Sequence, residues 1–274
     1  PSGPRPTSPA MHNAAFEALG LDWLYLPFDV EPGRLGEALK GIVALGLRGV
    51  NVTIPHKEAV IPYLDEVSEE VKAIGAVNTI VHRDGKRIGY NTDAIGFYNS
   101  LHLSLGLDRL PEEVVVLGAG GAARAVVYAL VASGEVKRVS IFNRTPERAE
   151  ELARQMQPLN PWTFVRAFPL EEGLLRREME GVGLLVNTTS VGMHPHSEGC
   201  IISNPELIPS GILVYDLVYN PLETVLLRIA KERGARPVNG LEMLLYQGAE
   251  SFRIWTGREP PIEVMRGELR RRLG

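Results

Sequence analysis

The chain has 274 residues, 45% of them hydrophobic, so it is long enough for one large domain or two smaller ones, each with a buried core. Its formal net charge of −4 and isoelectric point near 5.9 argue against a nucleic acid as the main partner. The single cysteine, Cys200, cannot form an intramolecular disulfide, and no long apolar run indicates a membrane span or a leader. We therefore expect a cytoplasmic protein that acts on a small molecule and binds neither nucleic acid nor a membrane.

Four prolines in the first nine residues exclude a regular helix or central strand there, and Ser8 is predicted to cap a helix that ends at Gly20. Short β-branched runs then alternate with amphipathic segments, which is typical of an α/β protein with parallel sheets. Strands are expected near residues 23–29, 49–54, 113–117, 138–142, 162–167, 183–187 and 212–216, and helices near 33–46, 122–134, 146–156, 240–257 and 261–273.

One interruption and one restart divide this pattern. Residues 76–93 read as two extended runs joined by Asp84 and Gly85, which predicts a β-hairpin. From residue 113 the order strand, glycine-rich turn, helix, strand begins again, as expected of a nucleotide-binding unit. We therefore expect a domain boundary near residue 100, with the last two helices packing back on the first domain.

The turn after the strand at 113–117 carries Gly118, Gly120 and Ala123 at the G-x-G-x-x-A spacing and opens a helix. The first glycine permits a tight turn, the second lets the backbone approach a pyrophosphate, and the small third residue lets the helix pack on the strand. Without this context the glycines would indicate only a strand-to-helix turn. With the strand and the helix both in place, the pattern predicts a dinucleotide site.

The end of the next strand bears on which dinucleotide is bound. An NAD site usually offers a carboxylate about 20 residues beyond the glycines, where it binds the ribose 2′-hydroxyl. Here Asn143 and Arg144 fill the strand end, 25 and 26 residues after Gly118, and Arg148 follows. Two guanidinium groups suit a 2′-phosphate, so NADP is predicted. The alternative is that they are surface arginines at an ordinary helix start.

The segment GVNVTIPHKEAV, residues 49–60, places Asn51, Thr53 and Lys57 around a proline after a predicted strand. On its own Lys57 reads as a surface residue in a first helical turn. Both ends of the predicted hairpin, however, carry polar clusters rich in amides and hydroxyls, which suit a polyhydroxylated substrate. These clusters consist of Asn78, Thr79, Asn91, Thr92 and Asp93.

Eight motifs in order carry a resemblance to a known family: SPAMHNAAF, NVTIPHKE, GAVNT, NTD, GAGGAA, NRT, YDLVYNP and GLEMLLYQG. From Ser8 to its end the chain resembles the shikimate dehydrogenases, NADP-dependent oxidoreductases that reduce 3-dehydroshikimate to shikimate in aromatic amino acid (chorismate) biosynthesis. The resemblance implies a two-domain α/β fold with a cleft between the domains. Residues 1–100, completed by helices in 239–274, would form a substrate-binding and catalytic domain with a mostly parallel sheet, and residues 101–238 a Rossmann domain that binds NADP.

The resemblance also implies roles for individual residues. Lys57 and Asp93 would form the catalytic pair, in which Lys57 stabilises the developing alkoxide and Asp93 positions the lysine and binds a substrate hydroxyl. The implied substrate ligands are Ser8, Asn51, Thr53, Asn78, Tyr219 and Gln247. The implied cofactor ligands are Gly118, Ala119, Gly120, Gly121, Ala122, Asn143, Arg144, Thr145 and Arg148, with Thr188, Leu217, Gly240 and Met243 for the nicotinamide half.

The chain departs from the family at its start. Members normally open with a central strand and a motif of two serines. Here the strand is missing, which we expect to weaken the substrate domain, and Pro6 stands at the first serine, so only Ser8 remains and one substrate hydroxyl ligand is missing. Two alternatives stay open: a quinate/shikimate dehydrogenase that uses NAD or NADP and, because of the atypical start, a shikimate-binding relative without turnover. The cluster of His194, His196 and Cys200 lacks a fourth nearby ligand, so no metal is expected. Oligomeric state is not readable from the sequence, and a homodimer is one option.

Overall fold

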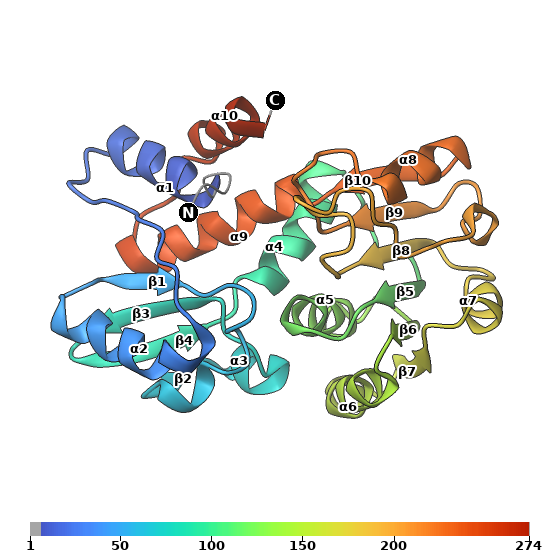
Figure 1. Cartoon of the computed structure of the whole chain (residues 1–274), viewed down its shortest axis with the longest axis horizontal. Helices are drawn as coiled ribbons and strands as arrows, with labels where there is room; N and C mark the ends of the chain where they lie inside the picture. The colour runs from blue at the N-terminus through green and yellow to red at the C-terminus, as the bar shows by residue number, and fades with distance from the viewer. Residues whose placement is uncertain (1–6, 274) are drawn as a thin grey trace. The chain divides into compact units, whose positions relative to one another are not determined.

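The structure is a computed structural model in which residues 7–273 are described. The chain divides into two compact units, Pro1–Gly96 with Leu244–Gly274, and Phe97–Met243. The boundaries fall inside two helices, α4 (Asp93–Asn99) and α9 (Leu241–Thr256), which are labelled in Figure 1. Among the described residues no helix has the length and apolar character needed to cross a membrane.

The first unit contains a four-stranded sheet in the order β1-β3-β4-β2. Its strands are β1 (Gly49–Asn51), β2 (Glu66–Val67), β3 (Thr79–Arg83) and β4 (Lys86–Tyr90). Strand β3 is antiparallel to both β1 and β4, while β2 is parallel to β4. The predicted α/β class is confirmed, but this sheet is mixed and not mostly parallel, because the hairpin places the antiparallel strand β3 between β1 and β4.

The hairpin β3–β4 turns at the predicted residues. Asp84 and Gly85 have φ of 51° and 75°, and Arg83 pairs with Lys86 across the turn. Two successive positive φ values match the twist of the flanking strands, which is why Asp-Gly is favoured in such turns. The tight turn brings the two polar ends of the hairpin, near residues 79 and 90, directly opposite one another.

Two local predictions in the amino-terminal region are wrong. Residues 21–31 form no strand, although Leu24 and Leu26 are 71% and 53% exposed while Trp23 and Tyr25 are partly buried. The alternation is present, but none of the described strands pairs with this segment, and a strand needs a ladder partner. Helix α1 (Thr7–Ala18) begins before Ser8, so Ser8 is not its cap.

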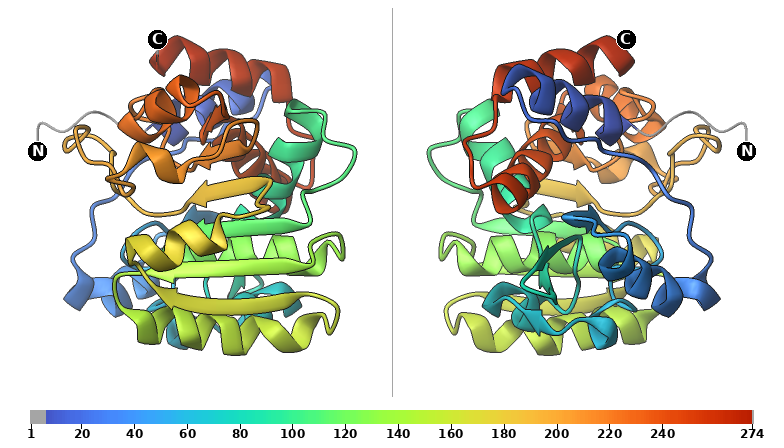
Figure 2. Two further views of the ribbon diagram at one scale, coloured as in Figure 1. Left: turned by 90° about the vertical axis from the view of Figure 1, so that its right-hand side faces the viewer. Right: turned by 90° about the vertical axis from the view of Figure 1, so that its left-hand side faces the viewer.

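The remaining helices of the first unit are α2 (Leu35–Ala44), α3 (Glu69–Ile74), α9 and α10 (Ile262–Leu273), with 3₁₀ turns at Pro32–Arg34 and Ile61–Tyr63. Leu35, Leu39 and Ile42 of α2 are buried in one cluster with Val60 and Ile80. Helices α1 and α10 lie side by side in each view of Figures 1 and 2. The carboxy-terminal helices therefore belong to the same compact unit as the amino-terminal segment.

The second unit is built on a six-stranded parallel sheet in the order β10-β9-β8-β5-β6-β7. Its strands are β5 (Glu113–Leu117), β6 (Arg138–Asn143), β7 (Phe164–Pro169), β8 (Leu184–Asn187), β9 (Leu213–Asp216) and β10 (Arg236–Asn239). The five strands that the sequence predicted in this unit, β5 to β9, are confirmed within two residues at each end. Strand β10 was not predicted, because its four residues include a proline and carry no apolar run.

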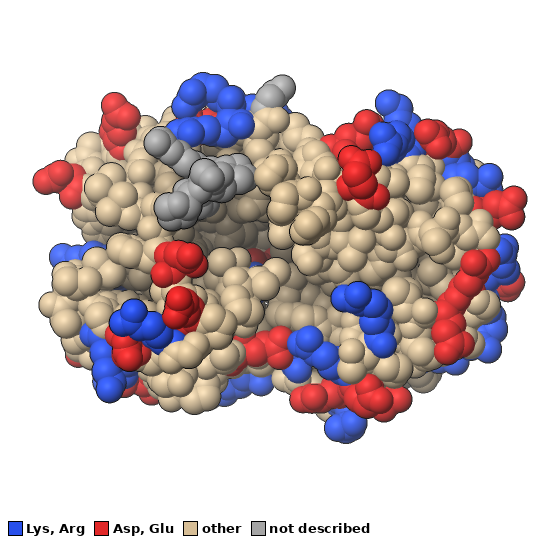
Figure 3. All heavy atoms as spheres, viewed as in Figure 1, with Lys and Arg blue, Asp and Glu red and all other residues tan. Residues whose placement is uncertain are grey.

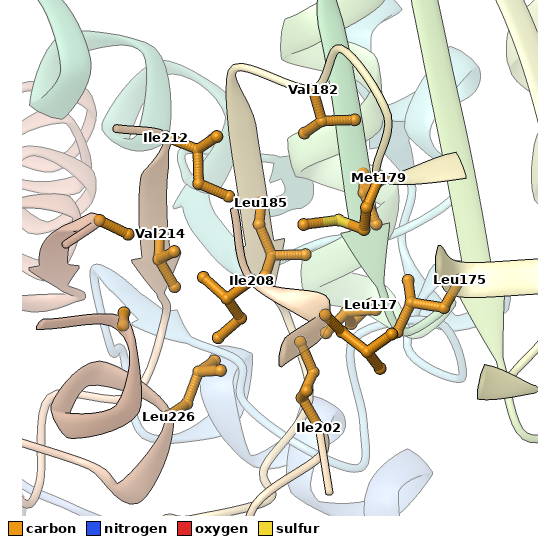
Figure 4. Packing of buried hydrophobic residues seen from close by; sticks show 14 of the residues in the cluster. Leu117, Leu175, Met179, Val182, Leu185, Ile202, Ile208, Ile212, Val214 and Leu226 are labelled. Carbon is orange, nitrogen blue, oxygen red and sulfur yellow. The ribbon is translucent and has the colours of Figure 1, made fainter. Parts of the chain in front are cut away.

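Helices cover both faces of this sheet, as in a Rossmann fold (Figures 1 and 2). Helices α5 (Gly121–Ala132) and α6 (Pro146–Met156) lie on one face, and α7 (Glu172–Glu178) and α8 (Val225–Glu232) on the other. Leu185 and Val214 of the central strands are buried in one cluster with Leu175 of α7 and Leu226 of α8 (Figure 4). Because both faces are covered, a strand can be continuously apolar, as residues 114–117 (VVVL) of β5 are.

Charged side chains of both signs are interspersed over much of the face drawn in Figure 3. Several ion pairs join side chains of one helix, such as Arg271 with Glu268 in α10 at 2.7 Å. Exposed pairs of this kind contribute about 0 to 1 kcal/mol each. The folding energy of both units therefore comes mainly from the buried clusters described above.

Candidate active site

In the first unit, strand pairing gathers polar residues that are far apart in the sequence. Asn51 at the end of β1 pairs with Thr79 at the start of β3, and Thr79 pairs with Tyr90 at the end of β4. The segments around residues 51, 78 and 92 are thereby brought to one edge region of the sheet. From the sequence we expected such a gathering of amides and hydroxyls at a site for a polyhydroxylated ligand.

The ion pair of Lys57 with Asp93 lies in this cluster. Lys57 Nζ donates to Asp93 Oδ2 at 2.5 Å, and the two side chains are only 15% and 8% exposed. The backbone on the lysine side is fixed by the N–H of Val77, which donates to the carbonyl of Lys57 at 2.8 Å. Asp93 is the first residue of α4 and also accepts from Asn78 Nδ2 at 2.9 Å. The ammonium group is thus held in place by a carboxylate that is itself oriented.

Asn78 is the buried centre of the cluster, with 2% of its surface exposed. Its Oδ1 accepts from the backbone N–H of Thr92 at 2.8 Å, which fixes the orientation of the amide. Its Nδ2 lies 2.9 Å from both Thr92 Oγ1 and Asp93 Oδ1 and 3.4 Å from Gln247 Oε1. Satisfied buried networks of this kind are rigid, because each partner lost would leave an unpaired polar group.

Asn51 extends the network to two residues that sequence reasoning missed, Tyr25 and Ser251. Tyr25 Oη donates to Asn51 Oδ1 at 2.9 Å, and Asn51 Nδ2 donates to Ser251 Oγ at 3.1 Å. Ser251 lies four residues after Gln247 in α9, on the same helix face, so that spacing could have found it. Tyr25 gave no usable signal, because its segment was expected to be a strand.

The structure brings together five of the predicted residues of this unit: Lys57, Asp93, Asn51, Asn78 and Gln247. Thr53 is exposed, and Ser8 is partly buried in α1. Neither side chain makes a hydrogen bond to the cluster among the residues that the structure describes. Pro6, the departure from the family pattern, lies outside the described residues.

In the second unit, the glycine-rich turn has the geometry that a pyrophosphate needs. Gly118 has φ of 111°, and a Cβ there would lie 2.5 Å from Thr188 Oγ1, so only glycine fits. Gly120 caps α5, and a Cβ there would meet no atom within 4 Å. The space over Gly120 is open, and the N–H groups that begin α5 at Gly121 and Ala122 suit an anion. The residues therefore fit a dinucleotide, with Ala119 buried behind the turn.

The end of β6 leads directly into α6. Asn143 Nδ2 donates to the carbonyl of Thr145 at 2.8 Å, and Thr145 occupies the cap position of the helix. Arg144 and Arg148 are exposed beside this helix start, together with Glu147 of the first turn. Guanidinium groups form charge-assisted hydrogen bonds with phosphate oxygens, so the placement of Arg144 and Arg148 at the end of β6 suits a phosphate.

The remaining predicted cofactor residues lie near the carboxyl ends of β5, β8 and β9. The N–H of Thr188 donates to the carbonyl of Leu117 and the N–H of Leu217 to that of Asn187, each at 2.9 Å. A Cβ on Gly240 would lie 2.1 Å from the carbonyl oxygen of Leu217, so these two backbones are in contact. Met243 is buried in the same unit, and burial raises the pKa of the Tyr219 phenol.

Asp216 is a buried acid at the end of β9 that sequence reasoning did not assign. It accepts from Asn187 Nδ2 at 2.9 Å, from the backbone N–H of Val218 at 3.1 Å and from Thr224 Oγ1 at 2.6 Å. Burial raises the pKa of Asp216 to about 6, against the effect of these hydrogen bonds. The carboxyl group therefore joins the end of β8, the loop after β9 and the start of α8.

His194, His196 and Cys200 lie in the segment between β8 and β9. Among the described residues, no group of three or more histidine, cysteine or acidic side chains is placed to hold a metal ion.

Comparison with known proteins gives the family. Three sequence models of protein families match the chain. That of the shikimate dehydrogenase substrate-binding domain matches residues 5–80, that of shikimate/quinate 5-dehydrogenase matches residues 106–168, and that of the shikimate 5′-dehydrogenase C-terminal domain matches residues 240–270.

Relatives and solved structures match along most of the chain. A protein of Moorella thermoacetica named shikimate dehydrogenase (NADP(+)) is 52% identical over 97% of this chain and 89% of its own length. A crystal structure of a shikimate dehydrogenase with NADP+ has a TM-score of 0.89 at 44% identity, covering 97% of this chain and 91% of the other. The Thermus thermophilus enzyme with NADP(H) and shikimate has a TM-score of 0.84 at 41% identity, covering 97% and 95%. The chain therefore belongs to the shikimate dehydrogenase family.

Proposed function

We propose that this protein is an oxidoreductase that catalyses the reversible reduction of 3-dehydroshikimate to shikimate with NADPH. The observation that carries the proposal is the ion pair of Lys57 with Asp93, held at 2.5 Å inside a cluster of oriented amides and hydroxyls. Similarity to NADP(+)-dependent shikimate dehydrogenases over 97% of the chain supports the choice of substrate and cofactor. A cytoplasmic location and a homodimer are further expectations that fractionation and sedimentation would test.

In this proposal, the first unit binds the substrate. The amides of Asn51 and Gln247 bind substrate hydroxyls, because oriented amides discriminate strongly between ligands that complete their hydrogen bonds and ligands that do not. Asn78, which the family resemblance also implies as a ligand, is buried with its amide paired inside the protein and orients Asp93. Ser8 and Thr53 of the same unit are further substrate ligands that the family resemblance implies, and Tyr219 of the second unit is another. They are candidates for residues that engage only when the ligand is bound.

NADPH supplies the hydride that converts the ketone carbon to the alcohol carbon. Lys57 stabilises the negative charge that develops on the ketone oxygen and donates a proton from Nζ to it. Asp93 holds Lys57 in position through Oδ2 and binds a neighbouring substrate hydroxyl. Because the ammonium group acts on charge that appears only in the transition state, its main effect is on kcat.

The second unit binds NADP. The N–H groups at the start of α5 bind the pyrophosphate over Gly120, and Arg144 and Arg148 bind the 2′-phosphate. The segments that contain Thr188, Leu217 and Gly240 hold the nicotinamide half. Asn143 and Arg144 stand at the end of β6, where an NAD site usually has a carboxylate. This favours NADP over NAD, because a carboxylate there would repel the 2′-phosphate.

The test is the absorbance of reduced nicotinamide after shikimate and NADP are mixed with the protein, with NAD run in parallel. A rise with NADP and a much smaller rise with NAD would support the proposal. Comparable rates with both cofactors would favour the broader quinate/shikimate type. Binding of shikimate by the folded protein without any rise would instead indicate a relative that has lost turnover.

A further inference from the structure

The amide of Asn51 uses all its hydrogens within the protein. Its Nδ2 carries two hydrogens. That nitrogen lies 3.1 Å from the carbonyl oxygen of Asn78, 3.0 Å from Thr79 Oγ1 and 3.1 Å from Ser251 Oγ. With three acceptors in reach of two hydrogens, no hydrogen is left for a ligand.

The oxygen of the same amide has capacity to spare. Asn51 Oδ1 can accept two hydrogen bonds, and one comes from Tyr25 Oη at 2.9 Å. Asn51 is only partly buried, so the second lone pair is the part of the amide that a ligand can use. A hydroxyl that binds there has to donate its hydrogen.

Tyr25 is held tightly enough to set this arrangement. Asn13 of α1 binds its backbone twice, donating from Nδ2 to the carbonyl oxygen at 3.0 Å and accepting from the N–H at 2.7 Å. The ring of Tyr25 stacks on His12 with centroids 4.7 Å apart and lies 5.9 Å from Trp255. Burial lowers the pKa of His12 to about 3, so the stacked imidazole is neutral. Asn13 thus fixes the backbone of Tyr25, and His12 packs against its ring.

We propose that Tyr25 is a positioning residue that fixes Asn51 with its carbonyl oxygen available to the substrate, so that Asn51 selects a substrate hydroxyl that acts as a donor. The inference rests on the proposed function, because it takes Asn51 as a substrate ligand. The phenol donates to Oδ1 and stabilises the orientation in which Nδ2 faces the three internal acceptors. Without the phenol, the amide loses one of the contacts that hold this orientation.

Steady-state kinetics of Tyr25→Phe, with Tyr246→Phe as the matched control, test the proposal. Tyr246 lies in the same unit, is 9% exposed and also has a phenol oxygen in a side-chain hydrogen bond, which Arg266 donates at 3.2 Å. For Tyr25→Phe we expect the KM for shikimate to rise about tenfold, equivalent to about 1.4 kcal/mol, with an unchanged KM for NADP and a smaller change in kcat. Tyr246→Phe should leave all three constants near those of the wild type.

A double-mutant cycle with Asn51→Ala separates positioning from a general structural effect. If Tyr25 acts through Asn51, adding Tyr25→Phe to Asn51→Ala should not raise the KM for shikimate further. Additive effects, or a Tyr25→Phe enzyme that matches Tyr246→Phe, would overturn the inference while leaving the proposed function intact. A wild-type protein that does not oxidise shikimate would overturn the proposed function, and this inference with it.

Discussion

Replacement of Gly118 by alanine should destabilise the second unit by an amount that the structure sets. At φ of 111° an alanine is strained by about 1 to 3 kcal/mol. Its Cβ would lie 2.5 Å from Thr188 Oγ1 and 3.0 Å from Thr189 Cγ2, so Thr188 has to move. Thr188 Oγ1 donates to the carbonyl of Leu117 at 2.7 Å, a hydrogen bond worth about 1 kcal/mol. We therefore expect a loss of about 2 to 4 kcal/mol.

Gly120→Ala is the matched control for this experiment. Gly120 has φ of −93°, and its Cβ would meet no atom within 4 Å, so the free energy of unfolding should change by less than about 0.5 kcal/mol. The same Cβ would enter the space assigned to the pyrophosphate, so the affinity for NADP should fall sharply. The two glycines are therefore expected to fail in different ways.

Urea unfolding followed by circular dichroism measures the first quantity, and NADP titration measures the second. The two units can unfold separately, so the transition of the second unit has to be resolved before free energies are compared. Equal stability of the two variants would refute the steric reasoning about Gly118. Full NADP affinity in Gly120→Ala would refute the placement of the pyrophosphate over that residue.

Three further predictions follow from single side chains. Lys57→Ala should lower kcat by orders of magnitude with little change in NADP binding, since its charge acts in the transition state; an active variant would remove the mechanism. Arg144→Ala should raise the KM for NADP far more than that for NAD, and equal losses would mean that the 2′-phosphate is bound elsewhere. The pKa of Asp216, raised from 3.8 to about 6, means that folding binds a proton, so this group's contribution to stability falls between about pH 4 and 6. Asp216→Asn keeps an acceptor for Asn187 but does not titrate. Relative to the wild type, its free energy of unfolding should therefore rise by up to about 3 kcal/mol between pH 4 and a pH above 6. Parallel pH profiles of unfolding free energy for the two proteins would contradict this.

The parallel sheet of the second unit was readable from the sequence because its signals are local. The run EVVVL followed by GAGGAA specifies a buried strand, a turn and a helix start within about a dozen residues, and the structure places β5 and α5 there. The Asp84-Gly85 turn likewise specifies its hairpin, since both residues accept positive φ. In each case the residues that make the pattern also make the contacts.

The predictions that failed depend on partners distant in the chain. Residues 23–29 have the alternation of a strand, but a strand also requires a neighbouring ladder, which a single segment cannot specify. The mixed order of the first sheet likewise arises from pairing among β1, β3 and β4, and not from any one of them. Strand β10 is too short and too polar to be recognised without the pairing to β9.

The sequence by itself determined the α/β class, the glycine turn, the basic end of β6 and, through its ordered motifs, the family, because these are properties of short runs of residues. The family resemblance also implied the pair of Lys57 with Asp93, whose side chains lie 2.5 Å apart in the structure. Only the tertiary structure decided which other polar groups meet: Asn78 with Asp93 and Gln247, and Asn51 with Tyr25 and Ser251. Those contacts join residues up to 200 positions apart. Hydrogen bonds act over about 3 Å of space whatever the separation along the chain, so the orientation of the site's amides is fixed by folding and not by any local pattern.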